Sequence, residues 1–120
     1  MSSYVRIIPM LSCMGMIFFM SHQPGDSLDL PLFPGADKLA HMAVYALLSG
    51  AVICAFSSRT RSKRRYLVLT AAILVPMLFG ISDEYHQSFV AGRSSEFFDV
   101  VADAAGALLV SIVWFVKTSK

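Results

Sequence analysis

Residues 97–116 read FFDVVADAAGALLVSIVWFV, and Asp99 and Asp103 are the only charged side chains in this stretch. A helix of about 20 residues rises about 30 Å, which is the thickness of the hydrocarbon core of a bilayer. The stretch lacks the alternation of apolar and polar residues that a strand of a membrane barrel shows. A helix also satisfies its own backbone hydrogen bonds in lipid. The stretch therefore predicts a transmembrane helix that carries two acidic side chains.

Three further apolar stretches precede this one along the chain. Together, the predicted spans cover about residues 4–21, 38–57, 66–83 and 97–116. Of the 120 residues, 56% are hydrophobic and 15% are charged, against about 25% charged residues in soluble domains. So short a chain cannot bury this much apolar surface, and a mean hydropathy of +0.63 also excludes a disordered chain. We predict an all-α, polytopic membrane protein in which residues 1–120 form one domain, with four transmembrane helices in two hairpins.

The first stretch has an alternative interpretation as a cleaved signal peptide, because Arg6 precedes most of its apolar residues. However, no pair of small residues in the cleavage pattern follows Met20, and Pro24 comes almost immediately afterwards. We therefore expect an uncleaved helix.

Basic residues are distributed unequally between the two sides that four crossings define. Five of them lie in residues 59–65, the linker between the second and third spans. The others on that side are Arg6, Lys117 and Lys120. Lys38 and Arg93 fall on the opposite side. Because the side rich in lysine and arginine faces the cytoplasm, both termini are predicted to be cytoplasmic. The basic linker is short and lies between two spans, so we expect the lipid bilayer as a partner and no nucleic acid.

The acidic residues show the opposite distribution, because all eight map to the outer half of this arrangement. Residues four apart share one face of a helix, and the polar residues at the outer ends of three spans follow that spacing. They are Asp37, His41 and Tyr45 in the second span, Asp83, Glu84 and Gln87 in the third, and Asp99 and Asp103 in the fourth. Acidic residues have little influence on orientation, so topology alone does not explain this clustering.

These side chains are candidates for one site beneath the outer membrane surface, since an aspartate inside a span normally faces the bundle interior or a wet cavity. The candidate catalytic residues are Asp37, His41, Asp83, Glu84, Gln87 and Asp99, and the candidate substrate-binding residues are Ser21, Gln23, Lys38, Tyr45, Arg93 and Asp103. The guanidinium of Arg93 is suited to grip a phosphate or carboxylate with two bonds. The carboxylates offer oxygen ligands to a hard cation such as Mg²⁺, although no spacing here is diagnostic of a metal.

Members of this set also have structural interpretations. Asp37 and Asp99 stand where an aspartate caps the N-terminus of a helix. His41 alone reads as a hydrogen-bonded structural histidine, and Gly106 as a point where two helices pack closely. One membrane depth is predicted to hold an imidazole, several acids, an amide and a guanidinium. This combination favours a shared site over these separate explanations.

The ordered set of polar residues resembles the VanZ-like family of small bacterial membrane proteins, named after a teicoplanin-resistance protein. The matching pieces, over about residues 21–110, are Ser21-His22-Gln23-Pro24, Asp37-Lys38 with His41 and Tyr45, Asp83-Glu84 with Gln87, Gly92-Arg93, and Asp99 with Asp103 and Gly106. His22 stands where the family pattern has a serine, and Asp103 stands where asparagine is common. The resemblance implies a multi-pass protein of the bacterial cytoplasmic membrane that acts in the cell envelope and, in some members, lowers glycopeptide susceptibility.

Three classes of function remain open at this point. An envelope enzyme would use a carboxylate paired with His41 as general base, and Arg93 to hold an anionic group of a lipid-linked or cell-wall precursor. A non-catalytic membrane protein would bind or sequester such a precursor, or a drug, with the same side chains. A small exporter is less favoured, because the first span and the inner halves of the others carry no acid.

Overall fold

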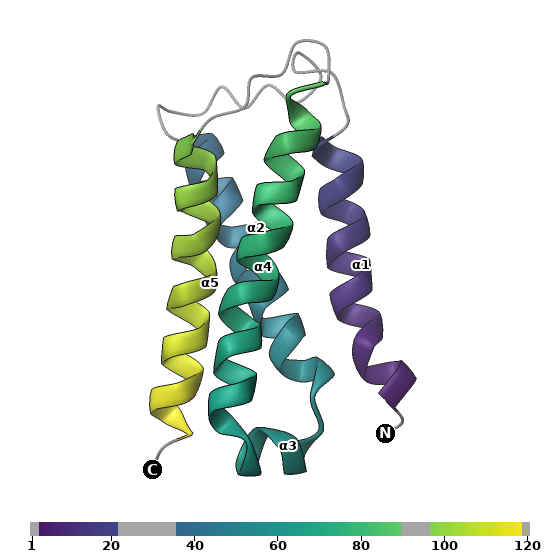
Figure 1. Cartoon of the computed structure of the whole chain (residues 1–120), viewed down its shortest axis with the longest axis vertical. Coiled ribbons are helices and arrows are strands. Elements are labelled where there is room, and N and C mark those ends of the chain that lie inside the picture. The colour runs from purple at the N-terminus through teal and green to yellow at the C-terminus, as the bar shows by residue number, and fades with distance from the viewer. Residues whose placement is uncertain (1–2, 22–35, 90–96, 119–120) are drawn as a thin grey trace.

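The computed structural model describes residues 3–21, 36–89 and 97–118. Its helices are α1 (Ser3–Ser21), α2 (Ala36–Ala55), α3 (Ser58–Lys63), α4 (Arg65–Gln87) and α5 (Phe97–Lys117). No strand occurs within these described ranges, which confirms the all-α prediction. The four long helices run side by side as one bundle, and the start of α1, the short helix α3 and the end of α5 lie at the same end of it (Figure 1).

Three of the long helices meet the length and hydropathy of a membrane crossing. Within the described residues these segments are Lys38–Ala55, Arg65–His86 and Phe97–Lys117. The first helix differs from the sequence prediction of a full span, because Ser3–Phe19 counts as a shorter apolar helix. Three of the four predicted spans are therefore found as candidate crossings, and α1 accompanies them as an apolar helix of the same bundle.

Large apolar side chains cover the outside of the bundle, and several polar side chains are buried inside it. Large apolar residues on every long helix are exposed, among them Phe19, Leu47, Leu78 and Leu109. The buried polar residues are Ser49, Asp83, Glu84, Asp99, Asp103 and Ser111. A soluble monomer rarely exposes so much continuous apolar surface, whereas lipid is the solvent that such a surface needs. The chain is therefore a multi-pass membrane protein.

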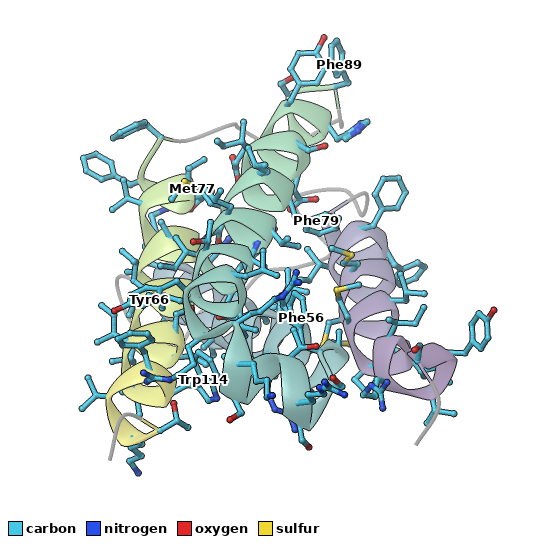
Figure 2. All side chains as sticks on the ribbon, turned by 60° about the horizontal axis from the view of Figure 1, so that its bottom comes forward. Phe56, Tyr66, Met77, Phe79, Phe89 and Trp114 are labelled. Atoms are coloured by element: carbon cyan, nitrogen blue, oxygen red, sulfur yellow. The ribbon has the colours of Figure 1, made fainter. Side chains whose placement is uncertain are left out.

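Two apolar clusters hold the bundle together. The first joins α1 to α2 through Ile17, Leu48 and Val52, and Phe79 of α4 packs against it. The second joins α2 to α4 through Ile53, Val68 and Ala72, and Val110 and Trp114 of α5 pack against it. Phe56 contacts both clusters, and it lies at the α3 end of the bundle on the side towards α1 (Figure 2).

The basic linker forms a short helix, where the sequence predicted only a connection. Ser57 caps α3, because its Oγ accepts a hydrogen bond from the backbone N–H of Thr60 at 3.1 Å. Arg61 donates to the carbonyl oxygen of Phe56 at 2.6 Å, and so satisfies a backbone group just beyond the end of α2. Arg65 donates to the carbonyl oxygen of Phe115 at 2.6 Å, which ties the start of α4 to the end of α5. Part of the positive charge of this linker is therefore used to close helix ends.

A proline in the middle of α4 explains a buried serine cluster. Pro76 has no N–H, so the carbonyl of Ala72 loses its partner four residues along the helix. Ser49 of α2 donates to that carbonyl oxygen at 2.9 Å, and its Oγ lies 3.0 Å from the Oγ of Ser111 in α5. Such a carbonyl would be costly to leave unpaired in lipid. The serines therefore join three helices at the level where the backbone of α4 needs a donor.

Gly106 marks the closest approach of α2 and α5, the most extensive helix pair in the bundle. A Cβ atom built on Gly106 would collide with the carbonyl oxygen of Met42 and would lie 3.0 Å from its carbonyl carbon. Because backbone meets backbone here, no side-chain rotation relieves that clash. The glycine interpretation of the sequence is confirmed, and the close approach brings the polar N-terminal halves of α2 and α5 together.

Candidate functional site

A contact between a histidine and a buried aspartate joins α2 to α5. His41 Nδ1 lies 2.8 Å from Asp103 Oδ1, and the side chain of Asp103 is 1% exposed. An ionised carboxylate only accepts hydrogen bonds, so the imidazole donates to it through Nδ1 and leaves Nε2 to other partners. The carboxylate two turns into the apolar helix α5 therefore fixes the orientation of the histidine.

A second contact of the same kind lies one turn nearer the N-termini of α2 and α5. Lys38 Nζ donates to Asp99 Oδ1 at 2.5 Å, with side-chain exposures of 28% for the lysine and 9% for the aspartate. A charged hydrogen bond of this length in partly dry surroundings is stronger than one in water. The two contacts lie one above the other in the interface between α2 and α5. In this interface, called the seam below, a basic side chain of α2 meets an aspartate of α5 at two successive turns.

Helix α4 closes the side of this seam with a glycine. A Cβ atom built on Gly80 would lie 2.8 Å from Asp103 Oδ2 and 3.4 Å from Tyr45 Cε1. The missing side chain leaves the room that the Asp103 carboxylate and the Tyr45 ring occupy. Within the described part of the chain, the buried Tyr45 hydroxyl and Asp103 Oδ2 have no hydrogen-bond partner.

The C-terminal end of α4 adds two more carboxylates to the interior. Asp83 and Glu84 are each 4% exposed. His41, Glu84 and Asp99 come from three different helices, and one ligand atom from each lies within 4.8 Å of the other two. A nitrogen and two carboxylate oxygens at this separation form a group that is able to hold a metal ion. Among the described residues, these three are the group with that geometry.

The comparison with known families decides what kind of membrane protein this is. A family model described as VanZ/LLP1 matches residues 6–118, which is nearly the whole chain. The chain belongs to the VanZ/LLP1 family. The match confirms the resemblance that the polar residues carried and extends it towards both ends. No curated protein and no solved structure matches this VanZ/LLP1 chain.

The candidate residues divide into those that the structure brings together and those outside its description. It brings together Lys38, His41, Tyr45, Asp83, Glu84, Asp99 and Asp103 on the facing sides of α2, α4 and α5. Gln23 and Arg93 lie outside the described residues. Ser21, Asp37 and Gln87 lie in helices, but their side chains are outside the described part. Their proposed roles rest on the sequence alone.

Sequence reasoning missed three features of this VanZ/LLP1 site. It grouped His41 with Asp37 on one helix face, whereas the structure gives His41 a partner on another helix, Asp103. It also missed the space at Gly80 and the serine at position 49. Pro76 was a usable signal for the serine, because a proline inside a span predicts a carbonyl that needs a donor. No pattern along one helix signals a contact between helices.

Proposed function

We propose that this VanZ/LLP1 protein is an enzyme of the bacterial cytoplasmic membrane that acts on the polar head group of a lipid-linked cell-wall precursor. The observation that best supports this proposal is the 2.8 Å contact between His41 Nδ1 and Asp103 Oδ1. An imidazole whose Nδ1 is held by a carboxylate presents Nε2 as a base in one orientation. A structural histidine alone would not need acidic side chains from two other helices, α4 and α5, around it.

Charge and exposure at the same level support a lipid-linked, anionic substrate. Lys38 keeps part of its side chain exposed while it holds Asp99, so it is able to meet a phosphate or carboxylate. Arg93 is proposed to add a second cation from the linker that follows α4. Phe97 and Phe98 are exposed beside Asp99, and Leu39 is exposed beside Lys38. These apolar side chains suit the hydrocarbon part of a lipid whose head group reaches the carboxylates.

The site is proposed to open on the extracytoplasmic side, with both termini and residues 59–65 in the cytoplasm. The positive-inside bias supports this orientation, because five of the seven residues from 59 to 65 are basic. We expect reporters inserted at positions 62 and 92 to give opposite signals, with alkaline phosphatase active only at 92 and a cytoplasmic fluorescent protein bright only at 62. Equal signals from one reporter at both positions would contradict the orientation.

The enzyme proposal is tested with purified protein in lipid nanodiscs and a wall precursor labelled in its head group. We expect wild-type protein to convert the precursor and His41→Gln to lower the rate about 100-fold or more, since positioned acid–base groups contribute about 10²–10⁴-fold. Asp99→Asn is expected to weaken conversion as well, because Lys38 loses its partner charge. His86→Gln is the matched control, since His86 is exposed on α4 and its ring packs on Phe18.

The same assay separates the enzyme from a non-catalytic binder. Binding of the labelled precursor without conversion would replace the enzyme by a binding or sequestering protein, and loss of that binding in Arg93→Ala would support this second function. Neither binding nor conversion would contradict both. In a glycopeptide-susceptible bacterium, wild-type protein is expected to raise the inhibitory teicoplanin concentration, and His41→Gln at equal abundance is not.

A further inference from the structure

We propose that His41, Glu84 and Asp99 together bind one divalent transition-metal ion, and that Zn²⁺ is the ion this donor set fits best. The proposal rests on the proposed function and deepens it at the same site: His41 Nε2 would hold the ion, and water bound to the ion would act in place of the imidazole as the activated group. It rests on the geometry of three helices and on one buried hydroxyl, as set out below.

The three ligand atoms are already close enough to share an ion. One atom each from His41, Glu84 and Asp99 lies within 4.8 Å of the other two. Ligand atoms of a tetrahedral ion with bonds of about 2.1 Å stand about 3.4 Å apart, so movements of about an ångström complete the site. Glu84 and Asp99 are buried and His41 is partly exposed, which leaves one side for an ion to enter. Three protein ligands with one open position are the arrangement of catalytic zinc sites.

The surroundings of two ligands match those of metal-binding side chains. Histidines that bind metals usually donate their other ring N–H to a carboxylate, which fixes the tautomer and raises ligand basicity. Asp103 Oδ1 accepts that bond from His41 Nδ1 at 2.8 Å, which leaves Nε2 for the ion. Asp99 uses one oxygen, Oδ1, for Lys38, so its other oxygen is available as a ligand. Both supporting contacts are therefore compatible with a bound ion.

The Tyr45 hydroxyl is a second observation that points to an occupant. Tyr45 is 1% exposed, and it lies one turn below His41 on the same helix. Asp83, Glu84 and Asp103 all act on it electrostatically, so its hydroxyl faces the carboxylates. Within the described residues that hydroxyl has no hydrogen-bond partner, and buried polar groups in native proteins almost always have one. A water or a substrate oxygen bound to the ion would supply the missing partner.

The donor types select the class of ion. Carboxylates alone suit Mg²⁺ and Ca²⁺, which take six or more oxygen ligands. An imidazole nitrogen among the ligands favours zinc and other first-row transition metals. The sequence suggested a hard cation such as Mg²⁺ from the carboxylates, and the position of His41 beside Glu84 and Asp99 changes that preference. When bound, the ion would supply a Lewis acid that faces the head group of the substrate.

The test measures metal binding alone, without any lipid substrate. Protein in nanodiscs is stripped with a chelator, dialysed against Zn²⁺, Mn²⁺, Mg²⁺ or Ca²⁺ separately, and its bound metal is determined by elemental analysis. We expect one Zn²⁺ per chain, with Mn²⁺ weaker and Mg²⁺ and Ca²⁺ weaker still. His41→Gln, Glu84→Gln and Asp99→Asn should each reduce affinity by more than the roughly 10–100-fold that loss of a supporting residue causes. His86→Gln is expected to bind Zn²⁺ as wild type does.

Each other result would overturn the proposal. Zn²⁺ binding that survives all three substitutions would belong to another part of the protein, and a preference for Mg²⁺ or Ca²⁺ would exclude an imidazole ligand. Absence of binding would exclude the site. A second measurement needs no variant: in wild-type protein loaded with Cu²⁺, pulsed electron paramagnetic resonance should detect one coordinated imidazole, and none or several would contradict the ligand set.

Failure of the metal proposal and failure of the proposed function are distinguishable. Turnover that depends on His41 but needs no metal would remove the ion and keep the enzyme. Zn²⁺ bound by His41, Glu84 and Asp99 in a protein that neither binds nor converts the precursor would keep the metal site and remove the proposed substrate.

Discussion

Replacing Gly106 with leucine is expected to abolish the folded bundle, and replacing it with alanine to lower the free energy of unfolding by about 1–3 kcal/mol, as overpacking does. The alanine methyl group would collide with the carbonyl oxygen of Met42 and would lie 3.0 Å from the carbonyl carbon and 3.1 Å from Cα. All three are backbone atoms of α2, so relief requires α2 and α5 to move apart. That movement would also loosen the contacts His41–Asp103 and Lys38–Asp99, which bridge the same two helices.

Two other glycines provide matched controls for this prediction. A Cβ atom on Gly50 of α2 would lie 4.0 Å from Val110 Cγ1 of α5. A Cβ atom on Gly15 of α1 would meet nothing within 4 Å. Gly50→Ala and Gly15→Ala are therefore expected to leave stability unchanged or slightly raised, since alanine is the better helix former. Thermal unfolding is followed through the fluorescence of Trp114, the single tryptophan, which packs on the cluster of Ile53, Val68 and Ala72. Equal melting of Gly106→Ala and Gly50→Ala would show that the close approach does not limit stability.

The positions of the helices could be predicted from the sequence because hydropathy and length are properties of single segments. The predicted spans 38–57, 66–83 and 97–116 overlap α2, α4 and α5 almost completely. The largest departure is α4, which continues to Gln87 and so holds Asp83 and Glu84 in a helix that reaches beyond the apolar run. Polar residues at the end of a span lower its mean hydropathy, so the apolar pattern stops before them. The helix itself continues, because the side chains of Asp83 and Glu84 are buried inside the bundle.

The membership of the site could be predicted only in part, because periodicity along one helix says nothing about its neighbours. Spacing of four residues correctly placed His41 near the level of Asp99. It could not identify Asp103 as the partner of His41, since that contact depends on how closely α5 approaches α2 at Gly106. The three-residue group of His41, Glu84 and Asp99 likewise exists only once three helices are assembled. Distances between helices are set by small residues, and the sequence marked Gly106 as such a contact but not the helix that it meets.

Replacing Asp103 with alanine is expected to leave the protein folded but to weaken Zn²⁺ binding about 10–100-fold, as loss of a residue that supports a histidine ligand does. An aspartate inside a span costs about 2.5–3.5 kcal/mol on insertion scales, so its removal relieves a cost that offsets the lost contact. His41 is able to remain neutral without its partner, and no unpaired charge stays behind. Asp103→Asn should keep most of the affinity, because the amide oxygen still accepts a hydrogen bond from His41 Nδ1. For each variant, Zn²⁺ affinity and melting temperature are measured on the same sample, so that weaker binding is distinguished from loss of folding.

Two further substitutions separate positioning of the histidine from general damage to the bundle. Gly80→Ala touches no proposed ligand, but its methyl group would lie 2.8 Å from Asp103 Oδ2 and 3.3 Å from Asp103 Cβ, so the carboxylate must shift. It should therefore weaken Zn²⁺ binding in the same direction as Asp103→Ala. Ser111→Ala removes a fully buried hydroxyl two turns deeper on α5, where it contacts Ser49, and should leave Zn²⁺ affinity unchanged. If Asp103→Ala and Ser111→Ala lower Zn²⁺ affinity equally, or if Asp103→Asn is as weak as Asp103→Ala, the carboxyl oxygen does not position His41 for an ion.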